Sequence, residues 1–321
     1  MQIKFLSISI LLFSLNANAL ETDNYLMWNR ELKDSSEKIN KFLVSEIQNA
    51  LNATNKKKIF QDCETVTNNI AAKFMSYFID KNPLENYLKA SLKHDEIYPG
   101  NGDYITNSIY RDPYRFYVPA FGLSPNVQVK DIYFGTDKLT HFSSTGRRYF
   151  NHYLKQIKDG MSDLDAQRSA VLFGIKNETS ILGYWSSGVY SYGDVEANYQ
   201  GFLFYKKMCF DKTETFLTQN EAGKWKLASL PDINEYVSPY WDETFNLSYR
   251  LPVNWDKVAP VIKERYCPMI NDAAVVERMD YYHHYPHNSF SLELVRELQG
   301  TGFEGTPIPE TTQSITKLCG I

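Results

Sequence analysis

Four polar residues between positions 135 and 205 have the types and spacing of a shared acid–base or metal site. Asp137 and His141 are four residues apart in a segment with helical apolar periodicity, so both side chains project from one side of a helix. Glu178 falls on the apolar stripe of a second expected helix, where burying its charge requires a cation or several hydrogen-bond donors. Asp194 begins a third expected helix. We therefore expect these four side chains to converge in one buried polar site.

Imidazole and carboxylate groups are ligands for divalent ions, and one histidine with carboxylates leaves coordination positions open. Such an ion lowers the pKa of a bound water and so generates a nucleophile. Without a metal, His141 or Glu178 acts as a general base after burial has shifted its pKa. The predicted metal ligands are Asp137, His141, Glu178 and Asp194, and the predicted catalytic residues are His141, Glu178 and Asp194.

Further polar and aromatic residues near these four are candidates for substrate binding. A Gly/Ser/aromatic loop over residues 183–193 precedes Asp194, and exposed rings beside hydroxyls suit stacking on a sugar ring or closing a lid. The alternative is that these rings pack on the core. Nothing in the loop distinguishes a glycan from a lipid headgroup or a peptide. The predicted substrate-binding residues are Arg148, Asn198, Trp185 and Tyr192.

Each of these residues also has a structural explanation. Asp137 at the start of its helix complements the helix dipole, and Ser191 with Asp194 has the spacing of a capping box. Asp242 and Glu243 either reach the central site or cap a turn. The alternative function is therefore a non-enzymatic envelope binding or scaffold protein, in which the same residues form a polar network that fixes helix packing. The sequence leaves open whether the chain is an enzyme.

The order of the polar residues resembles a known family. The pattern D-K-x-x-H-F, then a Glu ending an apolar helix, then S-x-x-D-x-x-x-N-x-x-G, is similar to the VanZ-like group and its YfiM-type envelope relatives. The resemblance implies a site and an envelope location, but no defined reaction. The membrane topology of VanZ does not carry over, because charged residues interrupt the helices at Arg147, Arg148, Lys155 and Lys158. The matching residues are Asp137, Lys138, His141, Phe142, Glu178, Ser191, Asp194, Asn198 and Gly201.

The apolar periodicity predicts a mainly α fold, with residues 20–321 forming a single helical domain around the core site region 135–205. Long, irregular, aromatic-rich loops interrupt the helices, above all at 97–135 and 183–193, and a strand is expected over 128–134. A long N-terminal helix is expected over 26–53. The helices that carry the polar residues are expected over 137–158, 163–182 and 194–208.

The first 19 residues have the features of a secretory signal peptide: a basic start at Lys4, an apolar core and the small-residue motif Ala17-Asn18-Ala19. No cysteine follows this motif, so no lipoprotein anchor is expected. No later segment reaches the ~18 apolar residues of a membrane-spanning helix. We therefore expect a periplasmic or secreted protein. Its four cysteines fit two disulfides of undetermined pairing, at Cys63, Cys209, Cys267 and Cys319.

Composition and motifs narrow the function classes. A formal net charge of −4 argues against nucleic acid as a partner. The chain contains no G-x-S-x-G, no H-E-x-x-H and no P-loop, and it lacks the paired E-x-x-H motifs of a di-iron bundle. The prediction is an exported envelope protein with a hydrolase-like activity on a lipid or cell-wall substrate, with the cofactor undetermined and a divalent metal as the candidate.

Overall fold

The computed structural model describes residues 21–57, 59–75, 82–99, 105–111, 123–179, 188–286, 288–299, 313 and 315–320. This part of the chain is mainly helical, as predicted, and its strands pair only in two-stranded sheets. The predicted signal peptide, much of the loops at 97–135 and 183–193, and Trp185 lie outside the described residues. The cysteines form two disulfides, Cys63–Cys209 and Cys267–Cys319.

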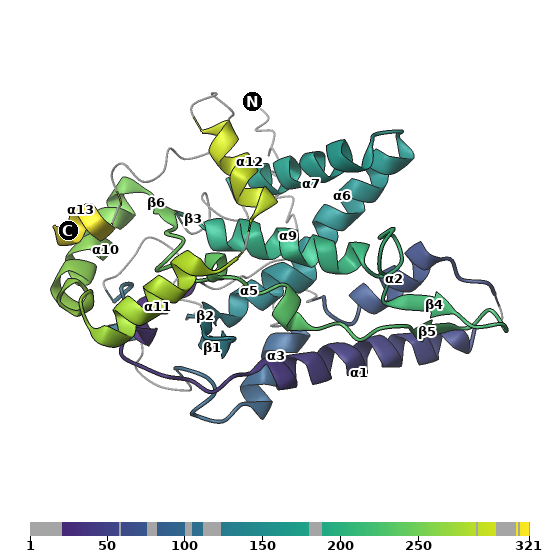
Figure 1. The fold of residues 1–321 in the computed structure, drawn as a ribbon, viewed down its shortest axis with the longest axis horizontal. Coiled ribbons are helices and arrows are strands. Elements are labelled where there is room, and N and C mark those ends of the chain that lie inside the picture. Colours follow the sequence, from purple (N-terminus) through teal and green to yellow (C-terminus); the bar gives the residue numbers. More distant parts are fainter. Residues whose placement is uncertain are drawn as a thin grey trace, which may run out of the picture.

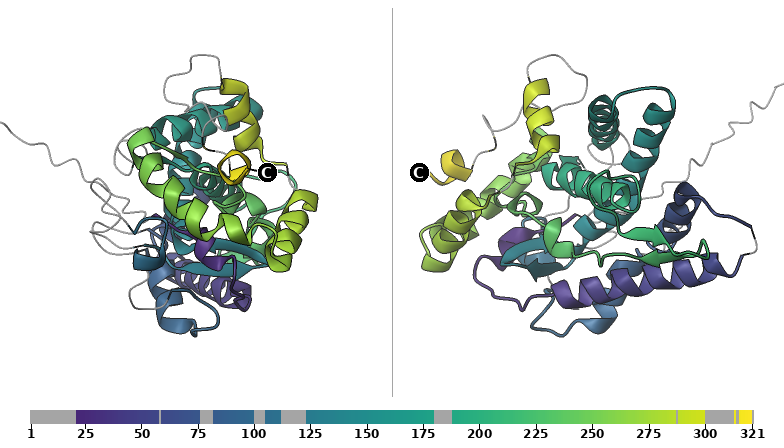
Figure 2. Two further views of the ribbon diagram at one scale, coloured as in Figure 1. Left: turned by 90° about the vertical axis from the view of Figure 1, so that its left-hand side faces the viewer. Right: turned by 45° about the vertical axis from the view of Figure 1, so that its right-hand side comes forward.

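A long helix, α1 (Ser36–Asn55), runs along one edge of the molecule (Figure 1). Its buried face, which includes Ile39, Leu43 and Ile47, contacts α2 (Cys63–Ala71) and α3 (Pro83–Ser91). The hairpin of β4 (Leu217–Gln219) and β5 (Trp225–Leu227) lies along the same helix, as the right-hand view of Figure 2 shows. The Cys63–Cys209 disulfide joins α2 to the segment that follows the central helix α9.

The expected helix over 26–53 is wrong at its N-terminal end. Between residue 21 and the start of α1, the only helical segment is the short 3-10 helix η1 (Asn24–Met27). The residues between them lie beside strand β1, where the Ser35 backbone N–H donates to the Gln128 carbonyl at 2.9 Å. Tertiary pairing therefore satisfies the backbone that a longer helix would have used.

The helix predicted over 137–158 is interrupted by a π turn. It consists of α5 (Thr136–Thr140), the π segment η3 (His141–Thr145) and α6 (Gly146–Lys158). A π turn changes the backbone pairing of the helix, and here side-chain donors compensate. The Tyr205 hydroxyl donates to the Ser143 carbonyl at 2.6 Å. His141 is the first residue of this π turn, so the wider turn sets the direction of its side chain.

Two further helices cover α6. The helix α7 (Asp163–Glu178) packs against it, and α9 (Tyr192–Lys206) crosses it at close range. A Cβ added at Gly201 would lie 1.8 Å from the Phe142 carbonyl oxygen, so only glycine lets the two backbones approach this closely. The helix predicted over 194–208 begins two residues earlier and ends two residues earlier.

The strand expected over 128–134 is instead a hairpin of β1 (Asn126–Val129) and β2 (Ile132–Gly135). Its two turn residues, Lys130 and Asp131, both have positive φ, 50° and 60°, as a tight two-residue hairpin requires. The strand β2 leads directly into α5 and thus into the polar site. A second antiparallel pair joins β3 (Val189–Tyr190), which directly precedes α9 in the chain, to β6 (Tyr249–Arg250).

Three C-terminal helices, α10 (Pro252–Arg265), α11 (Ala273–His284) and α13 (Ile315–Cys319), gather at one end of the long axis (Figure 1). The helix α12 (Phe290–Leu298) packs against α7 and α9. The short 3-10 turns are η4 (Ile233–Glu235), η5 (Pro239–Trp241) and η6 (Cys267–Met269). The Cys267–Cys319 disulfide ties α13 to η6. Two hydrophobic clusters result: a large one around the central helices, and a smaller one where η1 meets α10 and α11. Across the described residues, no helix combines the length and the apolar character that crossing a bilayer requires.

Candidate functional site

Three of the four predicted polar residues meet at the first turn of α9. His141, Glu178 and Asp194 each offer one ligand atom, and these atoms all lie within 4.8 Å of one another. The three residues are 4%, 5% and 9% exposed, so the group is almost removed from solvent. His141 Nε2 is 3.2 Å from Asp194 Oδ2. The expected convergence of these three side chains is therefore present in the structure.

Each of the three side chains comes from a different helix end. His141 is the first residue of the π turn, and Glu178 is the last residue of α7. Asp194 lies in the first turn of α9, where the Ser191 hydroxyl caps the helix by accepting from the Asp194 backbone N–H at 3.1 Å. The predicted capping role of Ser191 is therefore confirmed. The cap fixes the first turn of α9 and so positions the Asp194 carboxylate in the site.

Asn198 fixes the orientation of the His141 ring. Its side-chain oxygen lies 3.0 Å from His141 Nδ1, while its amide nitrogen donates to the Tyr149 hydroxyl at 3.4 Å. We assign the ring proton to Nδ1 because the group facing it is an acceptor. Nε2 then carries the lone pair, and this buried atom makes no hydrogen bond. Asn198, predicted to bind substrate, thus contacts the opposite side of the His141 ring from Asp194.

Asp137, predicted to join His141, belongs instead to an adjoining ion cluster. The ammonium of Lys138 is fully buried and lies 2.8 Å from Asp137 Oδ2, 2.8 Å from Asp194 Oδ1 and 2.7 Å from Glu243 Oε1. Burial alone would lower the pKa of Lys138, but the three carboxylates raise it well above its ordinary value. Lys138 is therefore a fixed positive charge, and Asp194 is shared between Lys138 and His141.

Segments far away in the sequence complete this ion cluster. The Thr22 hydroxyl donates to Asp137 Oδ1 at 2.5 Å, and the Ser191 hydroxyl donates to Glu243 Oε1 at 2.8 Å. Glu243 therefore reaches the site, one of the two roles considered for it. Its neighbour Asp242 has the other role, because it accepts from the Thr244 backbone N–H at 2.8 Å in a turn.

Sequence reasoning did not assign Lys138 and Thr22 to the site. The only signal for Lys138 was its place in the D-K-x-x-H-F pattern, beside a carboxylate on a buried helix. Thr22 gave no signal, because its contact with Asp137 spans 115 positions of the chain.

The charges of the site do not balance without an added cation or proton. Burial first, and then the nearby Asp194 carboxylate, raise the pKa of Glu178 well above its ordinary value. Burial also raises the pKa of Asp137 to about 6, although Lys138 opposes the shift. Burial would raise the pKa of Asp194 as well, but His141 and Lys138 hold it below its ordinary value. The buried Glu178 carboxylate therefore favours a proton or a neighbouring cation.

Two of the remaining predicted substrate-binding residues lie within the described part of the chain. Arg148 is half-buried on α6, and burial lowers its pKa. Tyr192 is buried at the start of α9 and lines a separate cavity. Trp185 lies outside the described residues.

No protein-family model, curated protein or solved structure matches this chain. The VanZ-like resemblance therefore remains a prediction from the residue pattern. Several pattern residues contact one another in the structure: His141 with Asp194 and Asn198, and Lys138 with Asp137. The pattern thus coincides with one spatial site.

Proposed function

We propose that this chain is an exported envelope protein related to the VanZ-like group, with a hydrolase-like, metal-assisted activity on a lipid or cell-wall substrate. One observation carries the activity: His141, Glu178 and Asp194 each place a ligand atom within 4.8 Å of the others, and His141 Nε2 has no hydrogen bond. Export is supported by the signal-like N-terminus and by the two disulfides.

The donor set fits a divalent ion. One imidazole nitrogen and two carboxylates are typical ligands of catalytic metal sites, and Asn198 supplies the contact that orients a ligating histidine. Bound there, the ion would supply a water of lowered pKa. Glu178, whose pKa burial raises above its ordinary value, is suited to act as an acid or base in this site. Lys138 holds Asp194 Oδ1, which leaves Oδ2 facing His141.

One observation favours the alternative, a non-enzymatic binding or scaffold protein. Lys138 meets three carboxylates inside the protein, and these come from α5, α9 and the segment after η5. Such a network fixes the packing of the elements it joins. In this alternative the His141 group is an extension of the network and has no substrate.

Hydrolysis assays with matched variants separate the two proposals. The purified oxidised chain, incubated with Zn²⁺ or Mn²⁺, is tested on 4-nitrophenyl esters, 4-nitrophenyl phosphate, phospholipids and peptidoglycan fragments. Activity in the wild type, reduced ~100-fold or more in His141→Ala and Glu178→Gln, supports the hydrolase. The control is His152→Ala, since His152 lies on α6 and contacts Ser169 at 2.9 Å instead of the site.

Stability provides the second readout. Catalytic groups are often held at the expense of stability, so His141→Ala and Glu178→Gln should melt near or above the wild type if the hydrolase proposal is correct. In a purely structural network each change leaves a buried group unpaired and lowers the free energy of unfolding by ~1–3 kcal/mol. Strongly destabilised variants, together with no wild-type activity on any substrate of the panel, would decide for the scaffold.

A further inference from the structure

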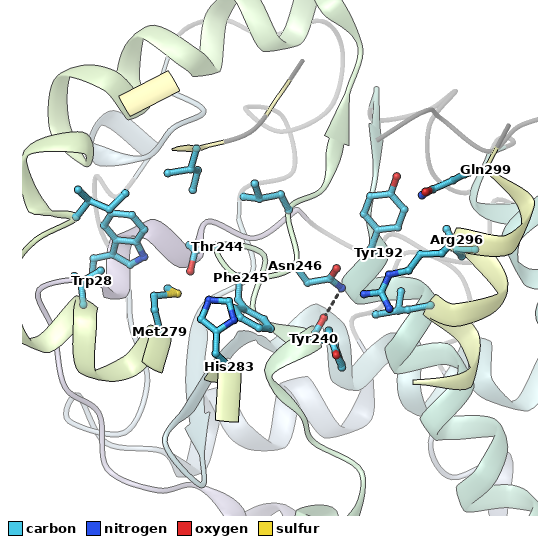
Figure 3. A pocket seen from close by; sticks show the side chains of 16 residues that line it. Trp28, Tyr192, Tyr240, Thr244, Phe245, Asn246, Met279, His283, Arg296 and Gln299 are labelled. Atoms are coloured by element: carbon cyan, nitrogen blue, oxygen red, sulfur yellow. Dashed lines mark hydrogen bonds between the residues drawn. The ribbon is translucent and has the colours of Figure 1, made fainter. Parts of the chain in front are cut away.

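A cavity of about 480 Å³ lies where the two hydrophobic clusters meet, apart from the His141 group (Figure 3). This volume is within the range of small-molecule sites, roughly 300–1,000 Å³. One wall belongs to the smaller cluster and the other to α9, α12 and the segment after η5. Its apolar lining includes Trp28, Phe245, Ile270, Val275, Met279 and Ile315.

The lining changes in character from one end to the other. Trp28, Met279, Phe245 and His283 gather at one end, and His283 contacts the Phe245 ring edge-on at 5.1 Å (Figure 3). The polar side chains gather at the opposite end; they are Tyr192, Asn246, Arg296 and Gln299. An occupant that matches this lining has an apolar body and a polar end.

The polar end carries the positive charge of Arg296, whose side chain is exposed. Among the described residues, no carboxylate pairs with Arg296 within ion-pair distance, although Arg168 pairs with Glu297, the residue next to it, at 2.9 Å. Arginine recognises carboxylate and phosphate through paired N–H donors. An anionic headgroup is therefore the complement of this end.

A buried donor lies along the body of the cavity. Trp28 is 3% exposed and is held by ring contacts to Tyr25 and Tyr266. Its indole N–H has no hydrogen-bond partner among the described residues. The indole nitrogen faces the space between Thr244 and Met279 (Figure 3). Burying an N–H without an acceptor costs free energy, so a hydrogen bond from this indole to an oxygen of the occupant would stabilise the complex.

We propose that this cavity binds a single-chain acyl amphiphile: an apolar chain beside Met279 and Phe245, an acyl carbonyl that accepts from the Trp28 N–H, and an anionic headgroup at Arg296. The cavity, the exposed Arg296 guanidinium, which has no ion-pair partner among the described residues, and the buried indole donor carry this assignment together. It does not depend on the proposed function, because none of these residues contacts His141, Glu178 or Asp194.

Calorimetric titration of the purified oxidised chain tests the assignment with three probes below their micelle concentrations. 1-Lauroyl-glycerol-3-phosphate has the chain, the carbonyl and the phosphate. Its 1-O-dodecyl ether analogue lacks the carbonyl, and 1-monolauroylglycerol lacks the phosphate. The wild type should bind the first probe saturably and each of the others about tenfold or more weakly. Laurate is a fourth titrant, which tells a carboxylate headgroup from a phosphate.

Single substitutions test which residue causes the preference for the phosphate and which causes the preference for the carbonyl. Arg296→Gln should remove the advantage of the phosphate, and Trp28→Phe should remove the advantage of the carbonyl. Arg168→Gln deletes a nearby positive charge outside the cavity and should bind as the wild type does. Leu247→Trp fills the cavity from a partly exposed position and should abolish binding while circular dichroism stays unchanged.

Three results would overturn the assignment: no saturable binding of the acyl phosphate, equal weakening by Arg168→Gln and Arg296→Gln, or undiminished binding in a folded Leu247→Trp. If Leu247→Trp does not fold, the probe preferences of Arg296→Gln and Trp28→Phe decide. Unchanged preferences in both variants would contradict the site.

Discussion

His141 Nε2 lies 3.2 Å from Asp194 Oδ2, and no hydrogen bond joins the two atoms. With the ring proton on Nδ1 facing Asn198, a lone pair on Nε2 faces a carboxylate oxygen. This contact is unfavourable unless a proton or a cation lies between the two atoms. The Glu178 carboxylate reaches the same space from α7. A cation bound between these atoms would remove this repulsion.

Replacing Lys138 should strongly destabilise the protein. Lys138→Met leaves three buried carboxylates without their shared cation, and breaking a buried ion pair in this way lowers the free energy of unfolding by ~3–5 kcal/mol. Urea denaturation measures the loss. Lys176→Met on the exposed side of α7 is the control and should change the free energy by ~0.5 kcal/mol or less. Equal effects of the two changes would contradict the buried cluster.

Stability without added metal should fall as the pH rises from about 4 to about 7. Burial raises the pKa of Asp23 to about 7 and that of Asp242 to about 6, above the ordinary value of 3.8. The folded protein therefore binds more protons than the unfolded chain across this window, and its stability decreases with pH.

Urea denaturation at pH 5.0, 6.0, 7.0 and 8.0 in a chelator measures this slope. We expect the free energy of unfolding to be at least ~1 kcal/mol lower at pH 8.0 than at pH 5.0. A flat or rising profile would show that the folded and unfolded pKa values of these carboxyls do not differ in the stated direction.

Local periodicity was sufficient to predict the helices of the site and the burial of Glu178. It did not indicate the π turn, which together with the crossing of α9 leaves His141 at 4% exposure.

The contacts between residues far apart in the chain could not be predicted from the sequence. Glu243 reaches Lys138 across 105 positions, and residues before α1 pair with β1 rather than extend the helix. Neither contact leaves a periodic signal, since both depend on how separate elements pack. The disulfide pairing was equally undetermined, because four cysteines allow three arrangements.

Both cysteine pairs should be oxidised in the exported protein. Thiol titration of the denatured, unreduced chain should detect no free thiol, since the Cα atoms are 6.3 Å apart in Cys63–Cys209 and 5.2 Å apart in Cys267–Cys319. Two or more titratable thiols would contradict export into an oxidising compartment. Reduction should lower the free energy of unfolding by ~2–5 kcal/mol for each bridge, because the disulfides close loops of 146 and 52 residues.

The binding of a divalent ion by His141, Glu178 and Asp194 is the central claim. Because burial raises the pKa of Glu178, a metal ion competes with a proton for this carboxylate, and the affinity for the ion should rise with pH. His152→Ala serves as the matched control, because His152 lies on α6 with its own partner Ser169.

The most direct test is the metal content of the purified chain after incubation with Zn²⁺ or Mn²⁺ and removal of free ion, measured by inductively coupled plasma mass spectrometry. We predict one ion per chain in the wild type and in His152→Ala, and none in His141→Ala or Glu178→Gln. Absence of a stoichiometric ion in the wild type, or retention of the ion in both site variants, would contradict the claim.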